Sequence, residues 1–168
     1  KTAIGTILAE HLGVDFVDSD EEISRAANMS VPEIFDRDGE DFFRLKETQI
    51  IGRLLGSRPH ILSTGGGAFL SNENRKMISG NAVSVWLDAE LETLWDRVKE
   101  KKSRPLLMVK DPKTALKNLY ISRKPQYAKA NIRVKALHSQ TKEVMVDRVI
   151  QTLLADPISG LSKVEKNA

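Results

Sequence analysis

The strongest constraint on the fold is the alternation of short strand-like runs with longer helix-like stretches along the chain. Apolar runs typical of buried strands cover residues 14–17, 60–64, 82–88 and 132–136. Apolar residues at helical spacing cover residues 4–12, 21–27, 42–55, 71–78, 90–101, 113–129 and 141–154. Strands that alternate with helices predict an α/β fold with a parallel β-sheet and helices on both faces. Sheets of this kind bind ligands at the carboxyl ends of their strands.

Capping residues divide these stretches. Gly13 and Gly56 are placed to end the first helix and the long amphipathic helix. Ser30-Val31-Pro32-Glu33 is a capping-box signature that opens a short helix, and Asp38-Gly39-Glu40 marks a turn or a restart. We expect one domain over residues 1–155 and a poorly ordered tail over residues 156–168, which is rich in Pro, Gly, Ser and Lys.

Composition excludes several classes of function. The 168 residues include no cysteine, which excludes disulfides, thiolate metal sites and thiol nucleophiles. No apolar run approaches the roughly 20 residues that a membrane helix needs. With 26 basic residues against 23 acidic ones, and 5% aromatics that do not interleave with a basic stripe, nucleic acid is not indicated as a partner. A cytoplasmic setting is the simplest interpretation.

Acidic and glycine residues lie where two predicted strands end. Asp18 and Asp20 follow the run 14–17, so one carboxylate could face a magnesium ion while the other faces a substrate. Alternatively, both are surface residues that cap the next helix. The run Gly65-Gly66-Gly67 follows residues 60–64, and its amides could bind an anion, although a plain flexible turn is an equal alternative.

Basic residues supply further candidates. Lys1-Thr2 has the final pair of a phosphate-binding loop, in which lysine reaches phosphate oxygens and the hydroxyl binds magnesium. Arg44, Arg104 and Arg123 could each clamp a phosphate or carboxylate in bidentate fashion, although any one of them could be an ordinary surface residue. Arg104 lies in the basic, proline-containing segment 99–112, which suits a mobile lid over a transferring phosphate.

The order of these pieces resembles the shikimate kinase family, whose members are P-loop enzymes similar to nucleoside monophosphate kinases. The matching text is Lys1-Thr2, F-V-D-S-D at 16–20, S-V-P-E-I-F at 30–35, D-G-E-D-F-F-R at 38–44, S-T-G-G-G-A at 63–68, R-P-L-L at 104–107 and R-K-P-Q-Y at 123–127. Together these motifs span most of the chain. The resemblance implies a three-layer P-loop architecture with a mobile lid, and ATP-dependent, Mg²⁺-dependent phosphorylation of the 3-hydroxyl of shikimate in aromatic amino-acid biosynthesis.

The resemblance also implies roles for residues near the phosphates. Lys1 would hold ATP phosphates, and Thr2 would ligate magnesium directly. Asp18 and Ser63 would hold water molecules around the ion. Arg104 would come down with the lid, at about residues 99–112, and stabilise charge on the phosphoryl group.

For the substrate, the resemblance implies a binding region at about residues 19–47. Asp20 would hydrogen-bond the reacting hydroxyl and orient or deprotonate it, while Arg44 and Arg123 would grip the carboxylate. The glycine turn, Gly65 to Gly67, would complete the pocket through the Gly66 amide. Phe35 and Phe43 would form an apolar wall, although an amphipathic helix buries phenylalanine in any case. The family suggests a monomer without nucleic-acid or membrane partners.

The family's first strand and the glycine-rich part of its phosphate loop do not occur in the sequence, which opens at Lys1. We therefore expect the sequence to be part of a longer one. Two alternatives stay open: a related P-loop kinase that acts on another small polyol, and a non-catalytic homologue that binds or regulates. The first would keep Lys1, Thr2 and Asp18 but need not keep Arg44 and Arg123.

Overall fold

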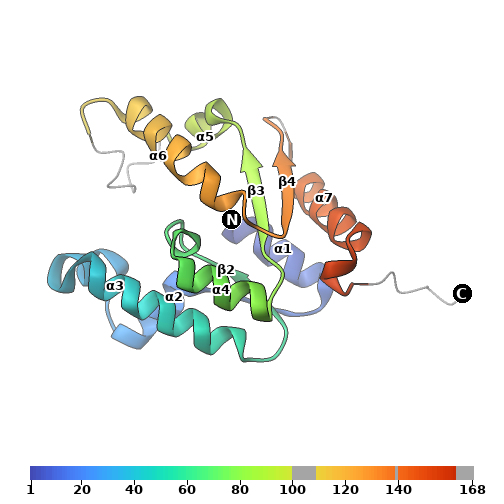
Figure 1. Ribbon diagram of the computed structural model, residues 1–168. Coiled ribbons are helices and arrows are strands. Elements are labelled where there is room, and N and C mark those ends of the chain that lie inside the picture. Colours follow the sequence, from blue (N-terminus) through green and yellow to red (C-terminus); the bar gives the residue numbers. More distant parts are fainter. Residues whose placement is uncertain (100–108, 139, 162–168) are drawn as a thin grey trace, which may run out of the picture. The chain divides into compact units, whose positions relative to one another are not determined.

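The computed structural model describes residues 1–99, 109–138 and 140–161, and the chain divides into two compact units, Lys1–Ser84 and Val85–Ala168. The elements of the first unit, most of which are labelled in Figure 1, are α1 (Thr2–Leu12), β1 (Asp15–Asp18), α2 (Ser19–Ala27), α3 (Val31–Leu55), β2 (His60–Ser63), η1 (Ala68–Leu70) and α4 (Asn72–Asn81). The elements described in the second are β3 (Val85–Ala89), α5 (Leu91–Val98), α6 (Pro112–Tyr127), β4 (Ile132–Ala136), α7 (Lys142–Ala155) and η3 (Pro157–Ser159).

The first unit is built around a parallel pair of strands. β1 and β2 are in register from Asp15 opposite His60 to Asp18 opposite Ser63. Alternate side chains face opposite sides of a strand. One side packs on α1, where a Cβ added to Gly5 would lie 2.6 Å from the Phe16 ring. Val17 and Leu62 pack on the other side against a core shared by α2 and α3, so helices cover both faces of this pair.

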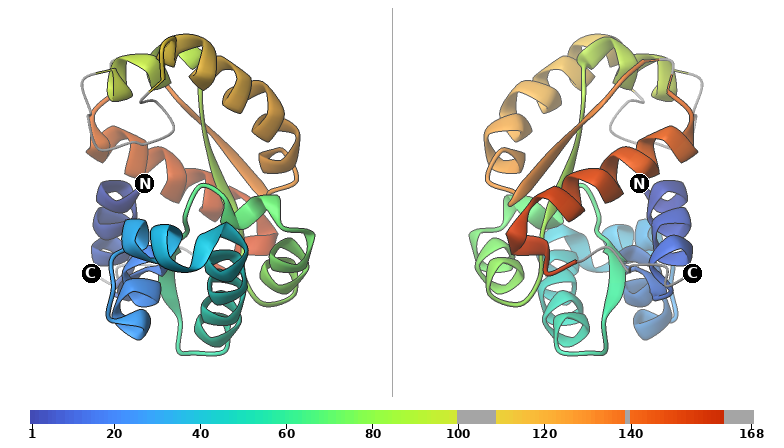
Figure 2. Two further views of the ribbon diagram at one scale, coloured as in Figure 1. Left: turned by 90° about the vertical axis from the view of Figure 1, so that its left-hand side faces the viewer. Right: turned by 90° about the vertical axis from the view of Figure 1, so that its right-hand side faces the viewer.

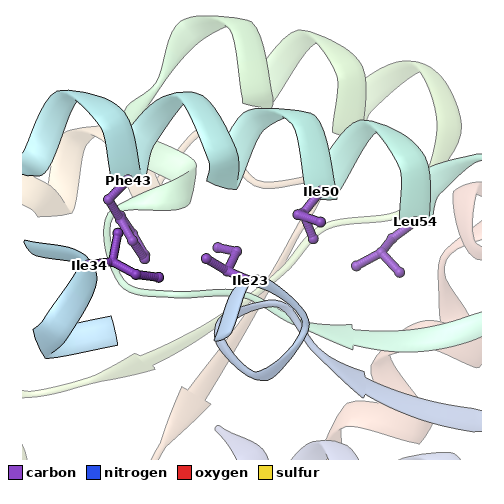
Figure 3. Close-up of a cluster of buried hydrophobic side chains, with 5 residues drawn as sticks. All are labelled: Ile23, Ile34, Phe43, Ile50 and Leu54. Atoms are coloured by element: carbon purple, nitrogen blue, oxygen red, sulfur yellow. The ribbon is translucent and has the colours of Figure 1, made fainter. Parts of the chain in front are cut away.

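That core consists of side chains that α2 and the two ends of α3 place together. Figure 3 shows Ile23 of α2 lying between Ile34 and Phe43 on one side and Ile50 and Leu54 on the other. Ile34 and Ile23 are at most 1% exposed. Burying aliphatic side chains of this size stabilises a fold by about 1.5–3 kcal/mol each, which fixes α3 against the strand ends.

α3 contains a sharp break in its backbone at Gly39, whose φ is 82° and ψ 174°. The capping box at its start is complete, because Ser30 Oγ accepts from the Glu33 amide (3.4 Å) and Glu33 Oε2 accepts from the Ser30 amide (2.8 Å). The break returns the chain towards its own first turns, so the Phe35 and Phe43 ring centroids lie 4.7 Å apart. The predicted short helix, the turn or restart at residues 38–40 and the long helix all lie within α3, where two helices meet at the Gly39 kink.

The second unit repeats the parallel arrangement. β3 and β4 are in register from Val85 opposite Ile132 to Ala89 opposite Ala136. β4 alternates between buried and exposed side chains, and α7 packs on it with a buried stripe that includes Val146. On α6, the Tyr127 ring lies 6.4 Å from that of Trp86 on β3. The two views in Figure 2 show β3 and β4 running between α6 and α7.

The predicted elements are confirmed with shifted ends. The first strand begins at Asp15 rather than at Val14, because the Val14 amide donates to Ala9 and belongs to the helix cap formed by Gly13. The third strand begins at Val85 rather than at Ala82, because the Ala82 amide donates to Ile78 and ends α4. Residues 100 and 101, which we expected to continue α5, lie outside the described part. Across the described ranges, no helix combines the length and the apolar character that crossing a membrane requires.

Candidate active site

Asp18 links the end of β1 to the start of α2 and to α1. Its Oδ1 accepts a hydrogen bond from the Asp20 amide at 3.0 Å, which makes Asp18 the N-cap of α2. Its Oδ2 accepts from the Thr2 hydroxyl at 3.3 Å. Asp18 therefore caps α2, which is the alternative role that the sequence allowed. Its second carboxylate oxygen still points to Thr2. Asp20 lies in the first turn of α2 rather than in a turn before it.

The end of β2 brings two more predicted residues to the same place. Ser63 is the register partner of Asp18 and is 8% exposed. The next residue, Thr64, accepts a hydrogen bond from the Lys1 ammonium through its carbonyl oxygen. Lys1, Thr2, Asp18 and Ser63 therefore gather where both strands end, as predicted from the sequence. Hydroxyl and carboxylate oxygens are hard ligands of the kind that Mg²⁺ prefers, so this donor set fits the ion.

The glycine turn passes close to three charged side chains. A Cβ on Gly65 would lie 2.8 Å from Asp20 Oδ1 and 3.1 Å from Glu47 Oε1, and a Cβ on Gly67 would lie 2.5 Å from Arg44 Cζ. Cβ atoms essentially never show contacts below 3.0 Å, so a side chain at Gly65 would displace the Asp20 carboxylate, and one at Gly67 would displace the Arg44 guanidinium. The Gly65 amide donates to Ser19 Oγ at 3.3 Å, which ties the turn to α2. Asp20 and Arg44 thus face the turn.

Arg44 is held by its own helix. Its Nη1 donates to Glu47 Oε2 at 2.8 Å, and its Nη2 donates to Glu40 Oε1 at 3.1 Å. The guanidinium carbon lies 5.2 Å from the centre of the Phe43 ring. Phe43 is 3% exposed and belongs to the core, and Phe35 packs against that core, so the burial of both rings needs no ligand to explain it.

Two carboxyl oxygens are buried here without a hydrogen-bond partner among the described residues, Asp20 Oδ1 and Glu47 Oε1. Burial and then the charge of Asp18 raise the pKa of Asp20, against the opposing effects of Lys1 and Arg44. Burial likewise raises the pKa of Glu47, although its bond to Arg44 opposes this shift. Buried acceptors are ordinarily hydrogen-bonded, so these two oxygens are open to a donor such as water or a ligand hydroxyl.

Sequence reasoning missed Glu47 and Ser19. The signal for Glu47 was available, because it lies four residues after Phe43 and three before Ile50, within the apolar stripe of α3. A carboxylate at such a position is a candidate for a buried, paired group. Ser19, which is 0% exposed, lies between the two aspartates and carries no comparable signal.

The two remaining predicted arginines are not part of the first unit. Arg123 lies on α6 in the second unit and is half-buried. Arg104 lies outside the described residues. In the second unit a different pair links the two strands, since Arg133 Nε donates to Asp88 Oδ2 at 2.8 Å and its guanidinium carbon lies 5.0 Å from the centre of the Trp86 ring.

Comparisons with known proteins place the chain in one family. The sequence pattern of the family described as shikimate kinase matches residues 1–154. The shikimate kinase of Ruegeria pomeroyi is 56% identical over 153 residues, which are 91% of this chain and 78% of that protein. The shikimate kinase of Cereibacter sphaeroides is 51% identical over 157 residues, covering 94% of this chain and 78% of that protein.

Solved structures agree. The structure of shikimate kinase from Acinetobacter baumannii in complex with shikimate has a TM-score of 0.84 and 33% identity, covering 92% of this chain and 86% of that one. The structure from Aquifex aeolicus has a TM-score of 0.82 and 31% identity, covering 95% of this chain and 93% of that one. The fold is thus the α/β P-loop fold of these enzymes, with parallel strands, and the chain belongs to the shikimate kinase family.

Proposed function

We propose that this chain transfers a phosphoryl group from ATP to the 3-hydroxyl of shikimate at the ends of β1 and β2. One observation carries the proposal: the Thr2–Asp18 pair lies at the same strand ends as Asp20, which faces the glycine turn together with Arg44. Phosphoryl transfer depends mainly on positioning and on neutralising charge. Those needs are met by the Lys1 ammonium, the Thr2–Asp18 pair, the Asp20 carboxyl group and the Arg44 guanidinium.

Around the phosphates, Lys1 would hold oxygens of ATP with its ammonium group. Thr2 would ligate Mg²⁺ through its hydroxyl, and Asp18 and Ser63 would orient water molecules bound to the ion. Bound Mg²⁺ supplies positive charge against the phosphate oxygens. The Lys1 ammonium donates to the Thr64 carbonyl, which holds it at the ends of the strands.

At the substrate, the partnerless Asp20 Oδ1 would accept the proton of the reacting hydroxyl, and a raised pKa makes Asp20 a better base than an exposed aspartate. Arg44 would bind the carboxylate of shikimate, with Glu47 and Glu40 holding its guanidinium in place. The Gly66 amide, flanked by Gly65 and Gly67, would complete the pocket beside Phe35 and Phe43. Arg123 as a second carboxylate ligand, and Arg104 with the lid at 99–112, remain predictions of the same proposal.

A coupled ADP-release assay with ATP, magnesium and shikimate tests the reaction on the protein that carries this sequence. We expect shikimate-dependent ADP release. Release that does not depend on shikimate, or no release from a folded protein, would overturn the proposal.

The carboxylate role is tested by Arg44→Ala and Arg123→Ala. Each should raise the KM for shikimate by roughly tenfold or more, because a charge-assisted pair is worth about 1.5–3 kcal/mol, while the KM for ATP stays unchanged. Arg25→Ala is a matched control, since Arg25 pairs with Glu22 on the surface of α2. An unchanged KM for shikimate in either variant would exclude that arginine from the clamp.

A further inference from the structure

The backbone of η1, which follows the glycine turn, is held by side chains of α4. Asn74 is 0% exposed, and its Nδ2 donates to the Ala68 carbonyl at 3.0 Å. Arg75 Nη1 donates to the carbonyls of both Phe69 and Leu70 at 2.7 Å. Three consecutive carbonyls are therefore bound by two adjacent residues of one helix.

The same segment is bonded back to the glycines. The Ala68 amide donates to the Gly65 carbonyl at 3.2 Å, and the Leu70 amide donates to the Gly67 carbonyl at 3.0 Å. In a trans peptide the C=O and the following N–H point in opposite directions. Because the Gly65 carbonyl faces η1, the Gly66 N–H faces away from η1. The orientation of this amide thus depends on where α4 holds residues 68–70.

The glycine turn lies directly against side chains of the proposed substrate site. The added-Cβ distances at Gly65 and Gly67 place its backbone against Asp20, Glu47 and Arg44 with no room for a methyl group. If α4 no longer held residues 68–70, the glycine turn would shift against these side chains, and the Gly66 amide would reorient. The interior of a protein transmits such displacements because it is close-packed.

We propose that Arg75, together with Asn74, is a positioning residue for the reaction, which acts by holding residues 68–70 so that the Gly66 amide is presented to the substrate. This inference rests on the proposed function. Neither side chain contacts substrate in this proposal. The chemistry that they serve is recognition of the substrate by the glycine turn, and it is separate from ATP binding by Lys1 and Thr2.

Steady-state kinetics of Arg75→Ala and Arg75→Lys test this role. Arg75→Ala should raise the KM for shikimate by roughly tenfold or more, since a displaced binding group is costly, and should leave the KM for ATP unchanged. Arg75→Lys should recover most of the affinity, because an ammonium group can donate to both carbonyls. Lys76→Ala, an exposed neighbour on the same helix, is the control.

Amide hydrogen exchange gives a readout that does not depend on activity. The amides of Ala68 and Leu70 should exchange faster in Arg75→Ala than in the unaltered protein or in Lys76→Ala.

If the unaltered protein phosphorylates shikimate and Arg75→Ala keeps its KM for shikimate, the positioning role is wrong. Equal increases in both KM values would also contradict it. An inactive unaltered protein would instead contradict the proposed function. If Arg75→Ala does not fold, Asn74→Asp takes its place, and an unchanged KM for shikimate in Asn74→Asp overturns the proposal.

Discussion

At the scale of single residues, the feature with the largest consequences is the carboxylate of Glu47. It is 1% exposed, one of its oxygens accepts from Arg44, and the other is buried beside the glycine turn. Burying a charged group is costly unless it is paired. Glu47 therefore fixes the guanidinium of Arg44 at the expense of its own desolvation, which is why its pKa is raised.

This shift predicts a pH dependence of stability. Because the pKa of Glu47 is higher in the folded state than the ordinary value of 4.5, its contribution is fully present below that value and is lost as pH rises through the folded-state pKa. The free energy of unfolding of the unaltered protein, minus that of Glu47→Gln, should fall as pH rises from about 4.5 towards neutrality.

Urea denaturation of both proteins over this pH range measures that difference. Glu40→Gln is the matched control, because Glu40 also pairs with Arg44 but has a side chain that is 65% exposed. A difference that rises with pH would contradict the assignment of a raised pKa to Glu47.

Site residues that directly follow a predicted strand could be predicted from the sequence. Asp18, Asp20 and the glycine turn follow predicted strands, and the structure brings them together. Glu47 was not predicted, because a glutamate on a helix is ordinarily solvated, and its burial depends on a turn 18 residues further along the chain. The roles of these residues remain predictions.

At the scale of the elements, the kink in α3 decides which side chains meet. Gly39 separates the segment that starts at the capping box from the one that carries Arg44, and it lets Ile34 and Phe43 enter one core (Figure 3). The sequence allowed either a turn or a restart at residues 38–40. Local propensity left this open, because a single glycine with positive φ can end one helix and begin the next.

Gly39→Ala should therefore lower the free energy of unfolding by about 1–3 kcal/mol, because its φ and ψ lie in a region that only glycine occupies readily. A Cβ at this position would meet no atom within 4 Å, so the cost is conformational rather than steric.

Gly80→Ala is the comparison for this measurement. Gly80 lies within α4 with open space around it, and the substitution should stabilise the protein by about 0.4–1 kcal/mol. Equal effects of the two substitutions in urea denaturation would show that the kink imposes no conformational demand.

At the scale of the whole molecule, the chain has two compact units, each with its own parallel pair of strands covered by helices. The alternation of strands and helices predicted the parallel pairing. It could not predict this division, because periodicity describes each segment's own environment and contains no information on which distant segments contact one another.

Ligand binding should stabilise the protein in proportion to occupancy. Shikimate at about 100 times its Kd should add roughly 2.7 kcal/mol to the free energy of unfolding, seen as a higher Tm by far-UV circular dichroism. With binding weakened about tenfold in Arg44→Ala, the same concentration should add only roughly 1.4 kcal/mol. An equal rise in both proteins would place shikimate away from Arg44.

The two units also differ in their aromatic side chains. All five phenylalanines lie within residues 1–84, whereas both tryptophans and both tyrosines, including the Trp86–Tyr127 pair, lie beyond residue 84. Tryptophan fluorescence is therefore a local probe of the second unit, and the first unit has no tryptophan or tyrosine to report its loss of structure. Agreement between fluorescence and circular dichroism during unfolding would mean that the two units unfold together, and divergence would mean that they unfold separately.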